Sequence, residues 1–362
     1  MENMARAKYK IVLSDLHLGF GPFNPDGSRN LLEEFHYDNQ FAELLDYYCS
    51  GTTAKAEVEL ILNGDIINHL HATSEDPMAD TLTETVALER TQSIIDGHPK
   101  FFDALSKFAN SPHRSIVYLM GNHDIGIAWA KVQQLLKNRV HPGLRFFLDC
   151  YESDGVYVEH GNRFLADNRV DLDNLFWTKG QQEPVLKMPW GCFFVIHFIN
   201  PLKKERPYIG KVYPFKYYLR WAIIHDTFFA IKTIAHLALY FLKINFVRDP
   251  KRSFSLLDTW KILREFSFPI MLDKEAKKVL DSKPSLRFVS FGHTHHPRYR
   301  QFAPGKEYIN TGSWSELIGL DVGSFGHQLR LAFAEVFIDE DGTLRSSLKK
   351  WRGVYREFEE FF

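Results

Sequence analysis

The sequence predicts an α/β fold interrupted by a long helical insertion. In the first half of the chain, short apolar runs rich in β-branched residues alternate with stretches of helical spacing, and further strand patterns lie near the C-terminal end. A long aromatic segment separates these two regions. The 362 residues, 45% of them hydrophobic, suffice to bury a full core, which excludes a disordered segment or a disulfide-stapled miniprotein.

Five short apolar runs have the length and composition of buried strands: residues 9–14, 58–63, 115–120, 155–159 and 287–291. Helical spacing between the first three predicts helices over 31–48 and 82–109. The second helix is expected to begin with a capping box formed by Thr81 and Glu84. This alternation of strand and helix indicates a layered core with parallel strands.

The C-terminal region predicts a second sheet, packed on the first as a sandwich. Its strands are expected at 307–310, 328–338 and 343–351, and the last two are joined by a turn at 339–342. Residues 167–285 are too long for a connection and too aromatic for a linker. We therefore expect one core built from 1–166 and 286–362, with 167–285 as an inserted cap.

Charge and cysteine content limit the partners and the compartment. The 44 Lys and Arg nearly balance the 45 Asp and Glu, so we expect no stable nucleic-acid partner held by overall charge. Cys49, Cys150 and Cys192 are widely spaced and include no C-x-x-C pair, which is typical of reduced thiols. The first residues lack the apolar region of a signal peptide, and a cytoplasmic location is expected.

Polar side chains follow directly on each of the five predicted strands, and glycine accompanies most of them. Because the carboxyl ends of parallel strands open onto one edge of a sheet, these residues are expected to converge. They are Asp15 and His17 after the first strand, Asp65 after the second, Asn122 and His123 after the third, His160 after the fourth, and His293 and His295 after the fifth.

The residue types indicate a metal site. Asp, Asn and His without Cys form an oxygen and nitrogen ligand set. Seven such ligands are too many for one tetrahedral ion but suit two ions bridged by a carboxylate, an arrangement used for displacement at phosphorus. Each fragment alone has an ordinary explanation, such as a capped turn, a core histidine or a helix N-cap, and it is their joint occurrence that favours the metal site.

Together these residues resemble the calcineurin-like metallophosphoesterases, whose fold is an αββα four-layer sandwich with a dinuclear metal site. The resemblance covers residues 9–165 and 286 to about 350. It implies that Asp65 bridges two ions and that His123 protonates the leaving oxygen or steadies the phosphate. The remaining ligands it implies are Asp15, His17 and His295 for one ion, and Asn122, His160 and His293 for the other.

This resemblance implies a hydrolase that cleaves a phosphoester or pyrophosphate bond with a hydroxide bridging two divalent cations. Manganese is the first choice of metal, with iron, zinc or a mixed pair open. Asp124 is a candidate to orient His123. Asn68, Arg163 and Arg169 are candidates for binding substrate phosphate, beside their ordinary interpretation as a turn residue and surface charges.

The insertion carries a local positive charge. Residues 200–252 contain 11 Lys and Arg against 3 Asp and Glu. A single helix over 221–247 would place His225, Lys232, His236 and Lys243 in one stripe beside a wide apolar face. Such a face suits a membrane surface contacted through 190–252 or an acyl-chain groove, although a helix buried in the cap explains it equally well. Its aliphatic content favours lipid over single-stranded nucleic acid.

Within the family, the insertion and the segments 296–297 and 308–314 resemble the UDP-2,3-diacylglucosamine diphosphatases. His123 departs from the best-studied branch, which has Arg at this position, and the insertion is longer. This resemblance implies a phosphorylated amphiphilic substrate and an enzyme peripheral on the inner face of a membrane. The alternatives are a soluble phosphoprotein, cyclic nucleotide or nucleic-acid substrate, and a scaffold that has lost catalysis.

Overall fold

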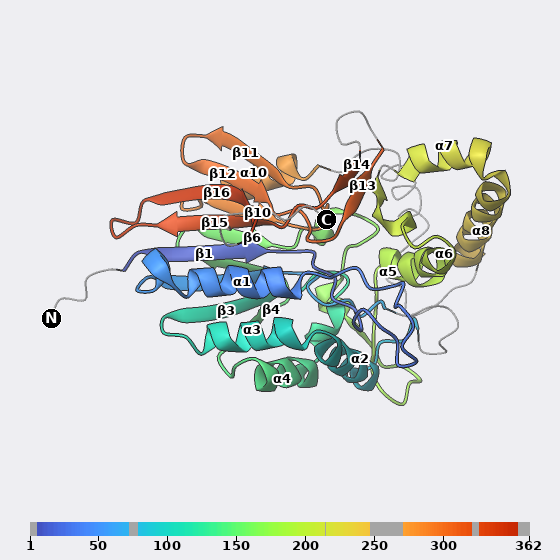
Figure 1. The fold of residues 1–362 in the computed structure, drawn as a ribbon, viewed down its shortest axis with the longest axis horizontal. Coiled ribbons are helices and arrows are strands. Elements are labelled where there is room, and N and C mark those ends of the chain that lie inside the picture. The colour runs from blue at the N-terminus through green and yellow to red at the C-terminus, as the bar shows by residue number, and fades with distance from the viewer. Residues whose placement is uncertain (1–5, 72–78, 214, 247–270, 321–325, 354–362) are drawn as a thin grey trace, which may run out of the picture.

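A computed structural model describes residues 6–71, 79–213, 215–246, 271–320 and 326–353 (Figure 1). Two sheets pack face to face, with helices on the outer side of each, and a helical cap lies at the end toward which β1 (Lys8–Leu13) points. The expected αββα layering is therefore confirmed. All three cysteines are free.

The first sheet has the strand order β16-β15-β1-β2-β3-β4. β1 to β4 run parallel, whereas β15 and β16 are antiparallel to their neighbours. The strands after β1 are β2 (Glu57–Asn63), β3 (Arg114–Leu119), β4 (Arg145–Phe147), β15 (Ala332–Ile338) and β16 (Leu344–Lys350).

The prediction that the last two strands belong to the second sheet is wrong. β15 pairs with β1, and the rings of Tyr9 and Phe337 lie 4.9 Å apart across this pairing. Ala334 and Val336 face the core between the sheets, so β15 shields one edge of the N-terminal strand. The expected turn between β15 and β16 is confirmed, since the amide of Gly342 donates to the carbonyl of Asp339 at 3.0 Å.

The second sheet has the order β11-β12-β10-β6-β5 and supplies the fourth and fifth predicted strands. Its strands are β5 (Cys150–Ser153), β6 (Val156–Glu159), β10 (Phe288–Phe291), β11 (Arg298–Ala303) and β12 (Lys306–Asn310). Its inner face packs on the first sheet through residues such as Val158 and Phe288, which contact Val12 and Val117 in a shared core.

Helices cover both outer faces. Four helices lie on the first sheet: α1 (Asp38–Tyr48), α2 (Glu84–Gly97), α3 (Pro99–Ala109) and α4 (Ala130–Arg139). On the second sheet, α10 (Asp273–Ser282) buries Ala276 and Leu280 against β10 and β12. α10 lies within the range 167–285 assigned to the insertion, yet it packs on the core.

The helix that was expected over 31–48 begins only at Asp38, because Glu33 binds the preceding loop in a non-helical form. Its carboxylate accepts hydrogen bonds from the amides of Gly19, Gly21 and Phe35 at 2.8 to 3.1 Å. His98 lies 3.3 Å from the same carboxylate. Glu33 thus holds the loop that follows His17.

The helix expected over 82–109 is two helices, because Pro99 cannot continue α2 and instead begins α3. The predicted capping box is also wrong. Thr83, not Thr81, caps α2, and its hydroxyl accepts a hydrogen bond from the amide of Val86 at 3.2 Å.

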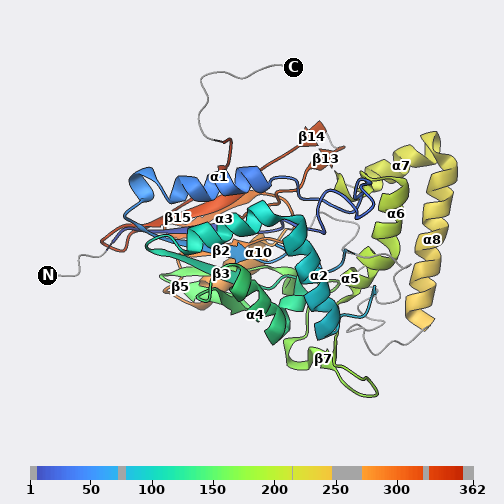
Figure 2. The same cartoon turned by 60° about the horizontal axis from the view of Figure 1, so that its bottom comes forward.

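The cap is built mainly from α5 (Trp190–Phe194), a π-helical turn (Val195–Ile199), α6 (Asn200–Glu205), α7 (Phe215–His225) and α8 (Thr227–Phe246). Two small sheets complete the cap. β7 (Phe176–Trp177) pairs with β8 (Val185–Leu186). β9 (Val212–Tyr213) pairs with β13 (Leu317–Gly319), which also pairs with β14 (Gly326–Gln328) and so joins the cap to the core. Figure 2 shows α8 at the outer edge of the molecule.

The single helix predicted over 221–247 is instead α7 followed by α8. The break falls at Asp226, whose carboxylate accepts a hydrogen bond from Arg206 at 2.7 Å. His225 and Lys232 therefore lie on different helices, and Lys243 lies on α8 with its side chain outside the described residues. No helix among the described residues is both long enough and apolar enough to cross a bilayer.

Candidate metal centre

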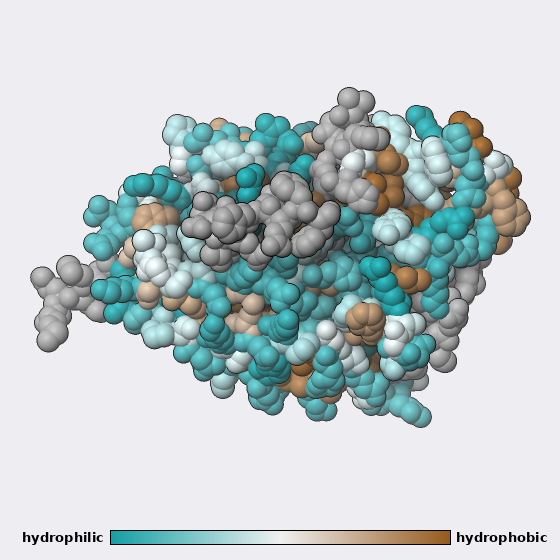
Figure 3. Space-filling model, in the orientation of Figure 1, coloured by the Kyte–Doolittle hydropathy of each residue, from teal (hydrophilic) through white to brown (hydrophobic). Residues whose placement is uncertain are grey.

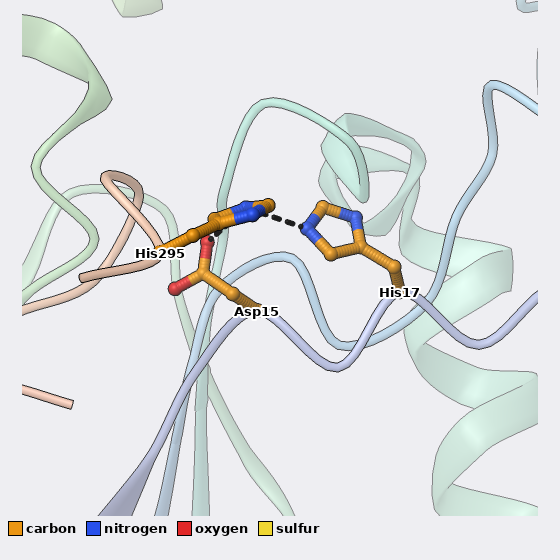
Figure 4. A group of neighbouring side chains, drawn as sticks. All are labelled: Asp15, His17 and His295. Atoms are coloured by element: carbon orange, nitrogen blue, oxygen red, sulfur yellow. Dashed lines mark hydrogen bonds and ion pairs between the residues drawn. The ribbon is translucent and has the colours of Figure 1, made fainter. Parts of the chain in front are cut away.

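The polar residues that follow the five strands meet at one place, where the ends of the two sheets adjoin. Three overlapping groups have ligand atoms within 4.8 Å of one another: Asp15, His17 and His295; His17, Asp65 and His123; and Asp65, His160 and His293. Figure 4 shows the first group, in which the side chains of Asp15 and His295 point toward each other and His17 faces His295. The groups share members, so they form one continuous cluster.

Left-handed backbone conformations aim these side chains. Among the described non-glycine residues with positive φ are Asp15, His17, Asp65, His293 and His295, with φ between 53° and 65°. Such conformations cost free energy outside glycine and occur where the surrounding structure enforces them, frequently at functional sites. Each of these residues lies in the turn where its strand ends, so the backbone bends the side chain into the shared pocket.

Asp15 joins the two sheets at this pocket. Its carboxylate accepts hydrogen bonds from the amide of His293 at 2.9 and 3.1 Å, and its carbonyl accepts one from the hydroxyl of Ser313 at 2.7 Å. The Nε2 atom of His295 lies 3.3 Å from the same carboxylate. A residue of the first sheet therefore orients the ligand loop of the second.

Asp65 lies at the middle of the cluster and is buried. One oxygen accepts a hydrogen bond from the amide of His123 at 2.7 Å. The other lies 3.2 Å from Nε2 of His160 and 4.0 Å from Nε2 of His17. This second oxygen therefore lies near both His17 and His160, which belong to different ligand groups.

Two buried atoms have the chemistry of cation ligands. His160 Nδ1 lies 2.8 Å from the carbonyl of Asn63 and donates to it, so Nε2 points at the carboxylates. It carries a proton when the ring is charged and offers a lone pair to a cation when the ring is neutral. Asn122 Oδ1 is buried and has no hydrogen-bond partner in the described part of the chain. A cation would satisfy both atoms, so the residues present fit a metal site.

Electrostatics also indicate that the pocket requires positive charge. Burial lowers the pKa of His160, but Asp65 and Asp15 raise it to about 10. Burial raises the pKa of these two carboxylic acids, yet His160 holds both below the ordinary value. Burial and the charge of His160 lower the pKa of His293 to about 3, which leaves its ring neutral and able to bind a cation.

His123 lies beside this cluster, with its ring 4.5 Å from that of His17. Its Nδ1 is 3.3 Å from Asn68 Oδ1, so Asn68, a candidate for phosphate binding, contacts His123 instead. Asp124, the candidate to orient this ring, has no hydrogen bond to it among the described residues. Its carboxylate accepts hydrogen bonds from the amides of Gly121 at 2.6 Å and Ile66 at 3.0 Å, which ties the loops after β2 and β3 together.

The other two phosphate-binding candidates lie outside the metal pocket. Arg163 pairs with the buried carboxylate of Glu159 at 2.5 Å and with Asp149 at 3.1 Å. Arg163 and Arg169 both line a separate cavity of about 600 Å³. The structure brings neither side chain to the cluster that includes Asp65.

The metal pocket itself has a volume of about 140 Å³ and one wall that the sequence did not indicate. Asp65, Asn122, His123, His293 and His295 form its polar side. The facing wall consists of Asp167 and Asn168 together with Trp190, Gly191, Phe194 and Val195, contributed largely by the cap. An aromatic run is equally typical of core packing, so no pattern in the sequence separates these residues from the rest.

A buried ion pair also joins the cap to the edge of the site. Lys203 of α6 lies 2.5 Å from the carboxylate of Glu34, which follows the His17 loop. Burial raises the pKa of Glu34, but Lys203 and His17 lower it to about 2. Neither residue belongs to a strand-end motif, and their partnership depends on two segments distant in sequence.

Residues 11–191 match the family model described as calcineurin-like phosphoesterase. The chain belongs to this family. It is accordingly a metal-dependent phosphoesterase, a hydrolase, and its clustered Asp and His residues are those expected of one. The match ends within α5, so it does not include His293 and His295.

Among solved structures, the chain matches a dimetal phosphatase from Danio rerio, with 9% identity and a TM-score of 0.37 over 96% of this chain and 99% of that chain. The calcineurin-like phosphoesterase YfkN from Bacillus subtilis has 11% identity and a TM-score of 0.35 over 97% and 93%. These likenesses are too distant to add to the family assignment. Comparison with curated proteins gives no match.

Substitution of Gly64 tests whether the turn after β2 positions the site. Gly64 has a φ of +76°, and a Cβ atom there would lie 2.5 Å from Nδ1 of His160. We expect Gly64→Ala to displace His160 and to lower kcat/KM for a soluble phosphodiester about a hundredfold. Phosphodiesterase assays together with metal analysis measure the effect.

Gly27→Ala is the matched control. Gly27 also has a positive φ, +82°, but no described atom lies within 4 Å of the added Cβ. It reproduces the backbone strain without the clash. Equal losses in the two variants would contradict a positioning role for Gly64.

Proposed function

We propose that the chain is a dinuclear phosphoesterase that hydrolyses a phosphoester or pyrophosphate bond. In this proposal Asp15, His17 and His295 hold one divalent cation, Asn122, His160 and His293 hold the other, and Asp65 bridges them. The observation that carries the proposal is the position of Asp65, which belongs to two of the three overlapping ligand groups and has an oxygen facing His17 and His160.

A bound pair of divalent cations would supply hydroxide at neutral pH, by lowering the pKa of a water, and would offset charge on the phosphate oxygens. The chain contributes the geometry. Asp15 and Asp65 are fixed by backbone amides of His293 and His123, so they do not reorganise when substrate binds. The carbonyl of Asn63 keeps the Nε2 lone pair of His160 directed at the pocket.

His123 is the proposed proton donor to the leaving oxygen. It lies on the pocket wall, and its Nδ1 is in contact with Asn68 Oδ1. In the proposal the ring acts as imidazolium: Nδ1–H stays on Asn68, Nε2–H gives its proton to the leaving oxygen, and the ring becomes neutral. The other role that the family resemblance implies for His123, steadying the phosphate, makes a different prediction about leaving groups. The two roles can therefore be separated by experiment.

The proposed substrate is amphiphilic, in the manner of UDP-2,3-diacylglucosamine or another phosphorylated lipid. Support comes from the pocket, where a polar metal-binding side faces an apolar wall that includes Trp190 and Phe194. An apolar group attached to the phosphate can pack on that wall. A soluble phosphoprotein, cyclic nucleotide or nucleic acid is the alternative substrate, and it would gain little from such a wall.

Metal analysis tests the dinuclear site. We expect two Mn²⁺ per chain after reconstitution, loss of activity on chelation, and recovery on adding Mn²⁺. Asp65→Ala should lower the stoichiometry below one, because it removes a ligand from both sites. His113→Ala, at an exposed histidine that precedes β3 at the strand end opposite to the ligands, should keep two. A fully active chain with one ion would contradict the dinuclear site. A chain that is fully active with iron or zinc alone would contradict manganese as the metal.

A leaving-group series tests His123. We expect His123→Ala to lower kcat about 10²- to 10⁴-fold for alkyl phosphoesters, whose leaving oxygen requires a proton. For 4-nitrophenyl esters the loss should be about tenfold or less, because 4-nitrophenolate leaves without protonation. Metal content should stay at the wild-type value. Equal losses for both substrate classes would instead assign His123 to holding the phosphate.

A chain-length series tests the amphiphilic substrate. For phosphodiesters with successively longer alkyl groups, we expect kcat/KM to rise about fourfold per methylene until the apolar wall is covered. Phe194→Ala should flatten this dependence. Phe23→Ala should not, because Phe23 lies outside the cap and its side chain is 66% exposed. The same kcat/KM at all lengths, with rapid turnover of a soluble nucleotide or phosphopeptide, would favour the alternative substrates.

A further inference from the structure

The outer surface of α7 and α8 exposes large apolar side chains that a water-facing helix ordinarily lacks. We name it the outer apolar face and define it by Trp221, Ile224, Phe228, Ile231, Leu239 and Leu242, which are 51% to 82% exposed. Figure 3 shows apolar surface gathered at this end of the molecule. A contiguous exposed apolar patch on a soluble domain marks an interaction surface.

The face is one side of an amphipathic helix rather than a scatter of residues. At 100° per residue, Phe228, Ile231, Leu239 and Leu242 fall within an arc of about 80° on α8. The opposite side of α8 is buried, where Phe229 and Tyr240 pack in the apolar cluster of the cap. α8 therefore has a face toward the cap and a second apolar face toward solvent.

The charge around this face distinguishes its partners. Residues 200–246 contain eight Lys and Arg, and their only two acids are Glu205 and Asp226. Both acids are paired, Glu205 with Lys232 and Asp226 with Arg206. Two of the cations also pair with acids outside the segment, Lys203 with Glu34 and Lys211 with Glu316. The eight cations still outnumber these four acids, so the segment keeps a positive charge that favours a negatively charged partner and disfavours a second copy of the same face.

We propose that the outer apolar face docks on a lipid bilayer that contains anionic headgroups. Its apolar side chains enter the boundary between headgroups and acyl chains, while Arg220 and the neighbouring cations contact phosphate. α7 and α8 lie on the membrane rather than across it, in keeping with the absence of a spanning helix among the described residues. This inference deepens the proposed function, because it identifies the source of an amphiphilic substrate.

The cap connects the docking face to the metal pocket by direct packing. The ring of Tyr240 on α8 lies 5.6 Å from that of Phe194, and the ring of Phe241 lies 5.7 Å from that of Trp190. Trp190 and Phe194 line the pocket that contains Asp65. The face and the pocket are therefore separated by one layer of helices, and the docked chain holds its active site near the headgroups.

Vesicle sedimentation with the full chain tests this docking. We expect the chain to pellet with phosphatidylcholine vesicles that contain roughly one third phosphatidylglycerol, and to bind phosphatidylcholine alone more weakly. Ile224→Glu and Phe228→Glu should each reduce binding about tenfold or more, because each replaces a large exposed apolar side chain that would enter the bilayer. Arg220→Glu should reduce binding to the anionic vesicles only.

Tyr47→Glu is the matched control, since Tyr47 is 53% exposed on α1, away from the cap, and should leave binding unchanged. All samples are also assayed with bis(4-nitrophenyl) phosphate. A chain that hydrolyses this substrate but stays in the supernatant would overturn the docking and leave the phosphoesterase intact. Face variants that bind vesicles normally, or that only convert a dimer to a monomer in sedimentation velocity, would also overturn it.

Discussion

The structure depends on two carboxylates, Asp15 and Asp65, buried among imidazole rings where water cannot solvate their charge. Burying an ionised carboxylate is costly unless a counter-charge and hydrogen bonds accompany it. Here the amides of His293 and His123 supply hydrogen bonds, and His160 supplies a proton. A pair of cations provides the same positive charge more completely. The strained turns at Asp15 and Asp65 and the histidines gathered around them meet this requirement.

The pocket joins two kinds of recognition that come from different parts of the chain. Its polar side is built by strand ends of the core, whereas its apolar wall comes largely from the cap. The cap is attached by the pairing of β9 with β13 and by the ion pair of Lys203 with Glu34. In the proposed function, chemistry at phosphorus and selection of the attached group could thus change independently, because they would belong to separate parts of the chain.

The sequence predicts the strand ends and their polar residues closely, because β-branched runs and the residues that follow them are local signals. It fails where the decisive contact is distant. α1 begins late because Glu33 binds the amides of Gly19 and Gly21, and β15 pairs with β1 across almost the whole chain. The breaks at Pro99 and Asp226 are local, but helical periodicity continues through both and conceals them.

The candidate site residues divide in the same way, into those that a local motif indicates and those that only a contact distant in sequence brings to the site. Asn122 and His160 belong to motifs that follow strands, whereas Trp190, Phe194 and Lys203 belong to an aromatic and basic segment with no distinguishing pattern. The apolar wall and the cap ion pair could be found only when the cap was placed over the strand ends. Arg163 and Arg169 illustrate the converse, since proximity to His160 in sequence does not bring them to its pocket.

The position of the ligands along the chain has a consequence for biosynthesis. Five of the seven proposed ligands precede the cap and could not complete the site alone, because His293 and His295 lie beyond the cap. β1 likewise gains its neighbour β15 only near the C-terminal end. A nascent chain emerging from the ribosome therefore has an incomplete, acidic half-site until His295 has been translated. The first sheet gains β15 later still, so the complete ligand set forms before the first sheet is finished.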